Sequence, residues 1–277
     1  MNDDLRTAAA DEGETTEAPR PRRKGIYVLP NAITLAALFS GFYAIVMAMN
    51  GRFDVAAIGI FCAAILDSLD GRVARMTNSQ SAFGEQMDSL CDMVNFGAAP
   101  ALIVLEWALK DLGKIGWIAA FVYISAAALR LARFNTNIGV VDKRFFQGLP
   151  SPAAAALVMG LIYVMDDAGF RGVAKIGWLS WTAFGVTLYA GLSMVTNAPF
   201  YSFKVVGGKR TVPFVVLVAI ALGIGLISLH PPIALFAVFC AYGLSGYGVY
   251  AWRKLKGKPT SVIAISTDDP DEKGLHP

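Results

Sequence analysis

The stretch Asp67–Asp92, DSLDGRVARMTNSQSAFGEQMDSLCD, holds four aspartates within a hydrophobic chain. Asp67 and Asp70 are three residues apart, and Asp88 and Asp92 are four apart. On helices, residues at these spacings share one face. A charge at membrane depth costs several kcal/mol unless it is paired, hydrated or bound to a metal. We therefore treat these aspartates as a candidate functional site.

The composition predicts an integral membrane protein, all-α, built as a polytopic transmembrane helical bundle. The chain is 55% hydrophobic and 16% charged, with a mean hydropathy of +0.52, whereas about 25% of the residues of a soluble domain are charged. About 20 residues are needed to cross a bilayer as a helix. Eight stretches meet that length, at about 31–49, 53–75, 85–108, 115–134, 150–166, 174–196, 211–229 and 232–252.

The domain organisation follows from the same pattern. We expect a disordered cytoplasmic tail over residues 1–24, a transmembrane catalytic domain over 25–255 and a second disordered cytoplasmic tail over 256–277, because both ends are polar. Lys and Arg concentrate on one set of alternating loops, whereas the other set holds only Arg52, Lys110, Lys114, Arg171 and Lys175. By the positive-inside rule, both termini and the mouth between the second and third spans face the cytoplasm.

The aspartates predict a metal site near that mouth. Two helices that each offer two carboxylates make an oxygen-rich cage, which suits Mg²⁺ or Mn²⁺. Four such carboxylates need counter-charge, and two divalent cations about 4 Å apart would supply it and assist phosphoryl transfer. Gly71, Ala74 and Gly84 leave room for a bulky ligand, and Arg75 can meet a phosphate.

The spacing Asp67-x2-Asp70-Gly71-x2-Ala74-Arg75-x8-Gly84-x3-Asp88-x3-Asp92 resembles, at every position, the signature of the CDP-alcohol phosphotransferase family. The resemblance implies a six-helix catalytic core, two divalent cations, and transfer of a phosphatidyl-type group from a CDP-linked donor to an alcohol with release of CMP. It also implies roles for the signature residues. Asp67, Asp70, Asp88 and Asp92 would bind metal, Asp92 would also be the general base, and Gly71, Ala74, Arg75 and Gly84 would line the CDP pocket.

Other segments lean towards one acceptor. The runs at Leu29–Thr34, Asp88–Ala101, Ala128–Asn135 and Phe146–Ala153 resemble the membrane-embedded phosphatidylserine synthases of bacteria and archaea. The substrates implied are CDP-diacylglycerol and L-serine, in a bacterial-type inner membrane. We expect Asn31 to reach the nucleotide, with helix capping as the alternative. The expected acceptor site is Arg130, Arg133, Asn135 and Asn95; anchoring by positive charge is the alternative for the two arginines.

Two alternative functions stay open at this point. The acceptor of the same reaction could be glycerol 3-phosphate, inositol phosphate or choline. Arg130, Arg133, Lys143 and Arg144 keep a phosphorylated acceptor possible. A cation-coupled transporter would use intramembrane acids for its coupling ion. The glycines over 223–225 and 243–248 suit close helix packing and a homodimer face. Membrane lipids are expected partners, and nucleic acid is not.

Overall fold

The computed structural model describes residues 28–136, 145–170, 177–201, 223, 225 and 228–256. Within these residues, four helices are long and apolar enough to cross a membrane. They are Val28–Met49, the continuous helix Ala82–Trp107, Lys114–Thr136 and Pro231–Leu255. The protein is thus an integral membrane protein, as its composition predicts.

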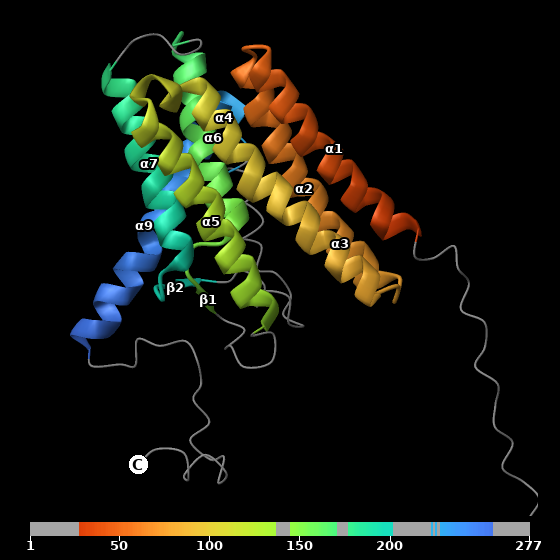
Figure 1. The fold of residues 1–277 in the computed structure, drawn as a ribbon. Helices are drawn as coiled ribbons and strands as arrows, with labels where there is room; N and C mark the ends of the chain where they lie inside the picture. Colours follow the sequence, from red (N-terminus) through yellow and green to blue (C-terminus); the bar gives the residue numbers. More distant parts are fainter. Residues whose placement is uncertain are drawn as a thin grey trace, which may run out of the picture.

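The described residues form a bundle of helices with one small ribbon (Figure 1). The elements are α1 (Val28–Met49), α2 (Phe53–Met76), α3 (Ala82–Asp92), a π-helical segment (Met93–Ala98), α4 (Ala99–Trp107), a 3-10 turn (Leu109–Leu112), α5 (Lys114–Thr136), β1 (Phe145–Gln147), α6 (Ser151–Asp167), α7 (Gly177–Val195), β2 (Pro199–Tyr201) and α9 (Pro231–Leu255).

Seven of the eight predicted spans coincide with these helices, counting Ala82–Trp107 as one. The predicted span 211–229 falls mainly outside the described residues, and so do both predicted tails apart from Lys256. The all-α membrane bundle is therefore confirmed, while the number of eight helices stays a prediction.

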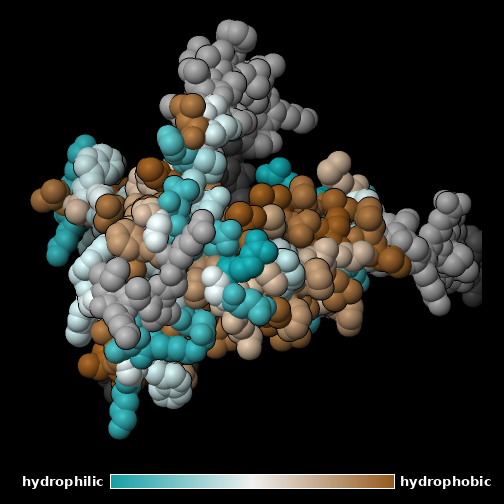
Figure 2. Space-filling model, turned by 90° about the horizontal axis from the view of Figure 1, so that it is seen from above, coloured by the Kyte–Doolittle hydropathy of each residue, from teal (hydrophilic) through white to brown (hydrophobic). Residues whose placement is uncertain are grey.

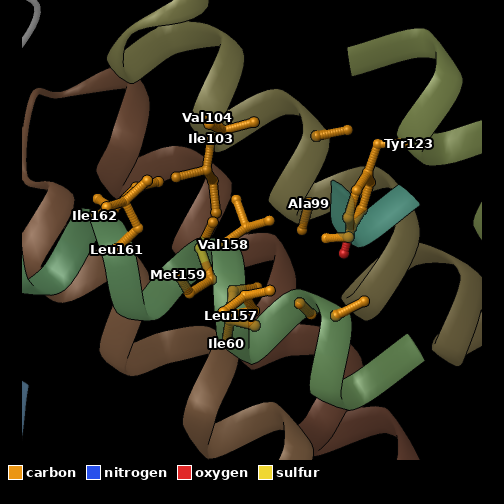
Figure 3. Close-up of a cluster of buried hydrophobic side chains, with 14 of the residues drawn as sticks. Ile60, Ala99, Ile103, Val104, Tyr123, Leu157, Val158, Met159, Leu161 and Ile162 are labelled. Carbon is orange, nitrogen blue, oxygen red and sulfur yellow. The ribbon is translucent and has the colours of Figure 1, made fainter. Parts of the chain in front are cut away.

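Helix α6 forms the centre of the core. Every residue from Ala153 to Ile162 is buried, and Figure 3 shows Val158 and Met159 among side chains from α2 and α4, including Ile60 and Ile103. The run of four alanines at 153–156 lets neighbouring backbones come close, which favours helix association in a membrane. Helix α6 therefore packs against both α2 and α4.

The outer surface of the bundle is apolar along several helices. Phe39 and Phe42 of α1 are 67% and 59% exposed, and Trp117 and Phe121 of α5 are exposed to a similar degree. In the view of Figure 2, hydrophobic side chains cover most of the right-hand part of the molecule, and hydrophilic ones gather towards the middle and lower left. Exposed apolar side chains on these helices are the expected surface for lipid contact.

One element is absent from the sequence prediction of an all-α bundle. Phe145–Gln147 is a strand that pairs antiparallel with Pro199–Tyr201. Phe146 lies opposite Phe200 in this ribbon. Strands of three residues carry too little periodicity to be seen in a sequence, because they depend on partners more than 50 residues away.

Candidate active site

A short polar turn brings the charged ends of α2 and α3 together. Helix α2 ends at Met76, and α3 begins after Ser81. Ser81 is the N-cap, since its Oγ accepts a hydrogen bond of 3.1 Å from the Gly84 amide. Such a cap satisfies one of the free N–H groups at a helix start. The turn therefore fixes where α3 begins, and with it the position of Asp88 on the helix.

Three of the predicted metal ligands converge across this turn. Carboxylate oxygens of Asp67, Asp70 and Asp88 all lie within 4.8 Å of one another. Asp70 is only 4% exposed, and its Oδ2 accepts a hydrogen bond of 2.6 Å from Thr34 Oγ1 of α1. Three carboxylates at this separation repel one another unless a cation lies between them. The donor set is all oxygen, which fits a hard divalent cation.

Asp92 lies beside this group. It is the last residue of α3, one turn after Asp88, and its carboxyl group interacts with that of Asp67 and with the charge of Arg130. Its Oδ1 is buried and has no hydrogen-bond partner among the described residues. One oxygen of Asp92 thus remains available next to the group of three.

The predicted CDP-binding residues lie at the N-terminal end of α1, in the last turns of α2 and at the start of α3. A Cβ placed on Gly71 would meet only Arg75 Nη1, at 3.9 Å, and Arg75 itself is exposed. A Cβ placed on Gly84 would lie 3.4 Å from Asn31 Oδ1, so Asn31 of α1 reaches the start of α3. Ala74 is half-buried one turn after Asp70. These positions border the three carboxylates, and their contact with a nucleotide stays a prediction.

Arg130 points towards the site from α5. Its Nη1 donates a hydrogen bond of 2.7 Å to Ser151 Oγ at the start of α6. Its Nε is buried and without a hydrogen-bond partner in the described part of the chain. The guanidinium is close enough to Asp92 for the two charges to interact. Arg130 therefore has a donor left for a ligand beside Asp92.

Arg133 shares the helix face of Arg130 but contacts different groups. Its guanidinium donates to the backbone carbonyl of Gln147 at 2.9 Å and to those of Met194 and Val195 at 3.2 Å each. These carbonyls belong to β1 and to the C-terminus of α7, which a cation stabilises. In this structure Arg133 joins the ribbon and α7 to α5, and its predicted contact with the acceptor stays untested.

The two predicted asparagines lie in different surroundings. Asn135 is exposed at the end of α5, and its Nδ2 donates a hydrogen bond of 3.2 Å to Ser89 Oγ, between Asp88 and Asp92 in sequence. Asn95 is fully buried in the π-helical segment and faces Gly41 of α1. Of these two residues, only Asn135 has an open side towards solvent.

The sequence prediction gave no role to two residues that hold the site. Thr34 binds Asp70, and Ser151 binds Arg130. Thr34 lies three residues after Asn31 and therefore on the same helix face. This spacing could have placed Thr34 at the site from the sequence alone. Ser151 gave no such signal, because its partner is 21 residues away.

Comparison with known proteins agrees with this geometry. Residues 27–196 match the model of the CDP-alcohol phosphatidyltransferase family. Among curated relatives, a CDP-diacylglycerol–serine O-phosphatidyltransferase of Helicobacter pylori is 36% identical over 82% of this chain and 92% of its own. One from Mycobacterium leprae is 33% identical over 82% of this chain and 76% of its own. One from Methanocaldococcus jannaschii is 28% identical over 80% of this chain and 95% of its own.

A solved structure of phosphatidylinositol phosphate synthase from Mycobacterium tuberculosis, with CDP-DAG bound, aligns at 20% identity and a TM-score of 0.47, covering 62% of this chain and 87% of that one. The family match over residues 27–196, together with the four membrane-length helices, defines a membrane-embedded phosphotransferase. The chain belongs to the CDP-alcohol phosphatidyltransferase family.

Proposed function

We propose that this enzyme transfers the phosphatidyl group of CDP-diacylglycerol to the hydroxyl of L-serine. The serine oxygen forms a bond to the lipid-linked phosphorus, and the bond between this phosphorus and the oxygen bridging to the CMP phosphate breaks. CMP leaves with that oxygen, and the proton of the serine hydroxyl passes to Asp92. The observation that carries the proposal is the convergence of Asp67, Asp70 and Asp88 within 4.8 Å, beside the buried carboxylate of Asp92.

In this proposal, most of the site residues bind the cations or the donor, and Asp92 accepts the proton. Asp67, Asp70 and Asp88, with Asp92 beside them, would hold divalent cations, which supply positive charge for the phosphates when bound. Arg75 would add a further positive charge on the exposed side, where charge develops on the phosphates. The space over Gly71 would receive the CDP group. Asp92, with one oxygen unpaired, is placed to accept a proton.

Arg130 is the residue we assign to the acceptor. Serine carries both a carboxylate and a hydroxyl. The free Nε of Arg130 suits the carboxylate, and the proximity of Arg130 to Asp92 would bring the hydroxyl to the proposed base. An arginine binds a carboxylate by charge-assisted hydrogen bonds. Asn135, which already reaches Ser89, borders the same side. The names of the relatives support serine as the acceptor.

We further propose that the site faces the cytoplasm, in a bacterial-type inner membrane. The distribution of Lys and Arg supports this orientation. The lipid tails of the donor would stay in the bilayer, while cytidine and serine enter from the aqueous side. A cysteine-accessibility experiment tests the orientation, with Met76→Cys as the single cysteine after Cys62, Cys91 and Cys240 are replaced by Ala, in sealed inverted and right-side-out vesicles. Labelling by an impermeant maleimide from the periplasmic face would contradict it.

The experiment that tests the reaction compares acceptors directly. Purified enzyme is given CDP-diacylglycerol and Mg²⁺ or Mn²⁺, and CMP release is measured with serine, glycerol 3-phosphate, inositol phosphate and choline. We expect release that depends on serine and metal, with radiolabelled serine recovered in lipid. Release with glycerol 3-phosphate and none with serine would contradict the acceptor. Solute flux without consumption of CDP-lipid would instead favour a transporter.

A further inference from the structure

The helix that carries Asp88 and Asp92 changes its winding directly after the site. Met93–Ala98 is π-helical, and it follows Asp92 without a break. A π-helical turn places one extra residue in the helix and is frequent at functional sites. Within this turn, Asn95 is 0% exposed, and neither atom of its side-chain amide has a hydrogen-bond partner among the described residues. Its position is therefore set by packing and not by hydrogen bonds.

The packing partner of Asn95 is a glycine of α1. A Cβ placed on Gly41 would overlap Asn95 Oδ1 and would lie 3.0 Å from Asn95 Cγ. Helix α1 thus meets the π-helical turn at a point where only a hydrogen atom fits. Glycine inside a helix costs about 1 kcal/mol relative to alanine, so the close approach is what accounts for a glycine here.

The opposite side of the turn is also fixed. Tyr123 of α5 is fully buried, and its hydroxyl donates a hydrogen bond of 3.0 Å to the carbonyl of Phe96. The turn is therefore held between α1 on one side and α5 on the other. Because Asp92 is the residue before this turn, a shift of the turn moves the Asp92 carboxylate.

We propose that Gly41 is a positioning residue for Asp92, acting through Asn95. The inference rests on the proposed function, in which Asp92 accepts the proton of the acceptor hydroxyl. A side chain on Gly41 would push Asn95 and the π-helical turn away from α1. A misplacement of about 1 Å at a reacting group can lower a rate by about 100-fold.

The first variant is Gly41→Ala, and its kcat and KM are measured from CMP release by the purified enzyme. We expect kcat to fall by about 10- to 100-fold, while KM for CDP-diacylglycerol changes by less than about threefold. The matched control is Gly185→Ala in α7, where an added Cβ meets nothing within 4 Å. The control should keep its kcat and should not lose Tm, because alanine is the better helix former. A Gly41→Ala enzyme as active as the control would overturn the inference.

The second variant makes room again. In Gly41→Ala/Asn95→Ala, the atoms that would collide are gone, and the nearest remaining atom of residue 95 named in the contact, Cα, is 3.4 Å from the new Cβ, an ordinary contact. We expect the double variant to turn over at least about fivefold faster than Gly41→Ala, and to recover its Tm. A double variant no faster than Gly41→Ala would overturn the inference, because relieving the collision with Asn95 would then not restore turnover.

Failure of the proposed function would appear differently. It would show as wild-type enzyme that releases no CMP with serine. Failure of the positioning inference would show as active wild-type enzyme without the loss in Gly41→Ala or without rescue in the double variant. The Tm values of the four proteins report the Gly41–Asn95 contact whatever the acceptor is.

Discussion

Thr34 of α1 donates a hydrogen bond of 2.6 Å from its hydroxyl to Asp70 Oδ2 of α2, and both residues are buried. A helix that contributes no carboxylate to the metal site thus orients one of the carboxylates. Groups that hydrogen-bond a metal ligand orient it, and their loss typically lowers metal affinity or activity by 10- to 100-fold.

Replacing Thr34 by Val keeps the shape of the side chain and removes the hydroxyl. We expect the Mg²⁺ concentration for half-maximal CMP release to rise by about 10-fold, because Asp70 loses the group that holds its orientation. The control is Thr182→Val on α7, where the exposed hydroxyl only bonds the Trp178 carbonyl of its own helix. Equal metal dependence in the two variants would contradict the role of Thr34.

Asp92→Asn tests the proposed base. We expect CMP release to fall by about 10²- to 10⁴-fold, the usual contribution of a general acid or base, with no loss in Tm. The control is Asp54→Asn, which also replaces a carboxylate by an amide. Asp54 lies in the first turn of α2, at the opposite end of this helix from Asp67 and Asp70, so this variant should keep full activity. Turnover near wild type in Asp92→Asn would remove Asp92 from the mechanism.

Gly71→Leu tests where the donor binds. The added side chain would fill a space in which a Cβ meets only Arg75, so we expect normal folding and a KM for CDP-diacylglycerol raised by at least about 10-fold. Gly248→Leu on α9, where a Cβ meets nothing within 4 Å, is the matched control. An unchanged KM in Gly71→Leu would place the CDP group elsewhere.

The two arginines of α5 should separate into binding and stability. Arg130→Lys keeps the charge but loses the Nε donor, and we expect KM for serine to rise by about 10-fold with little change in Tm. Arg133→Lys cannot reach the carbonyls of both β1 and α7, so we expect its Tm to fall by about 5 °C. Kinetics and thermal unfolding in detergent measure both, and the reverse pattern would exchange the two roles.

The sequence was sufficient for the bundle and for the centre of the site. Apolar stretches of membrane length predicted the helices, and the spacing of Asp67, Asp70 and Asp88 predicted that their carboxylates converge, because helical periodicity is local. The contacts of Arg133 and Asn95 could not be predicted this way. Arg133 binds carbonyls some 60 residues away. Asn95 lies in the π-helical segment, which no residue type in the sequence predicts.

The predicted homodimer face also depends on distant contacts. Gly246 of α9 packs closely on the ring of Phe200, and Gly243 lies against Tyr189. These glycines therefore serve packing inside the chain, which sequence alone could not distinguish from packing between chains. The homodimer stays a prediction.

The central helix α6 has a consequence for how this protein is made. It has 17 residues, hence a length of about 26 Å, less than the roughly 30 Å of a bilayer interior. Its Gly160 rests against Phe236 of α9, a helix synthesised later. Because α6 is short and packs closely on α9, we expect it to reach its final depth in the membrane only after α9 has been inserted. Truncation before α9 should leave the nascent protein open to quality-control proteolysis.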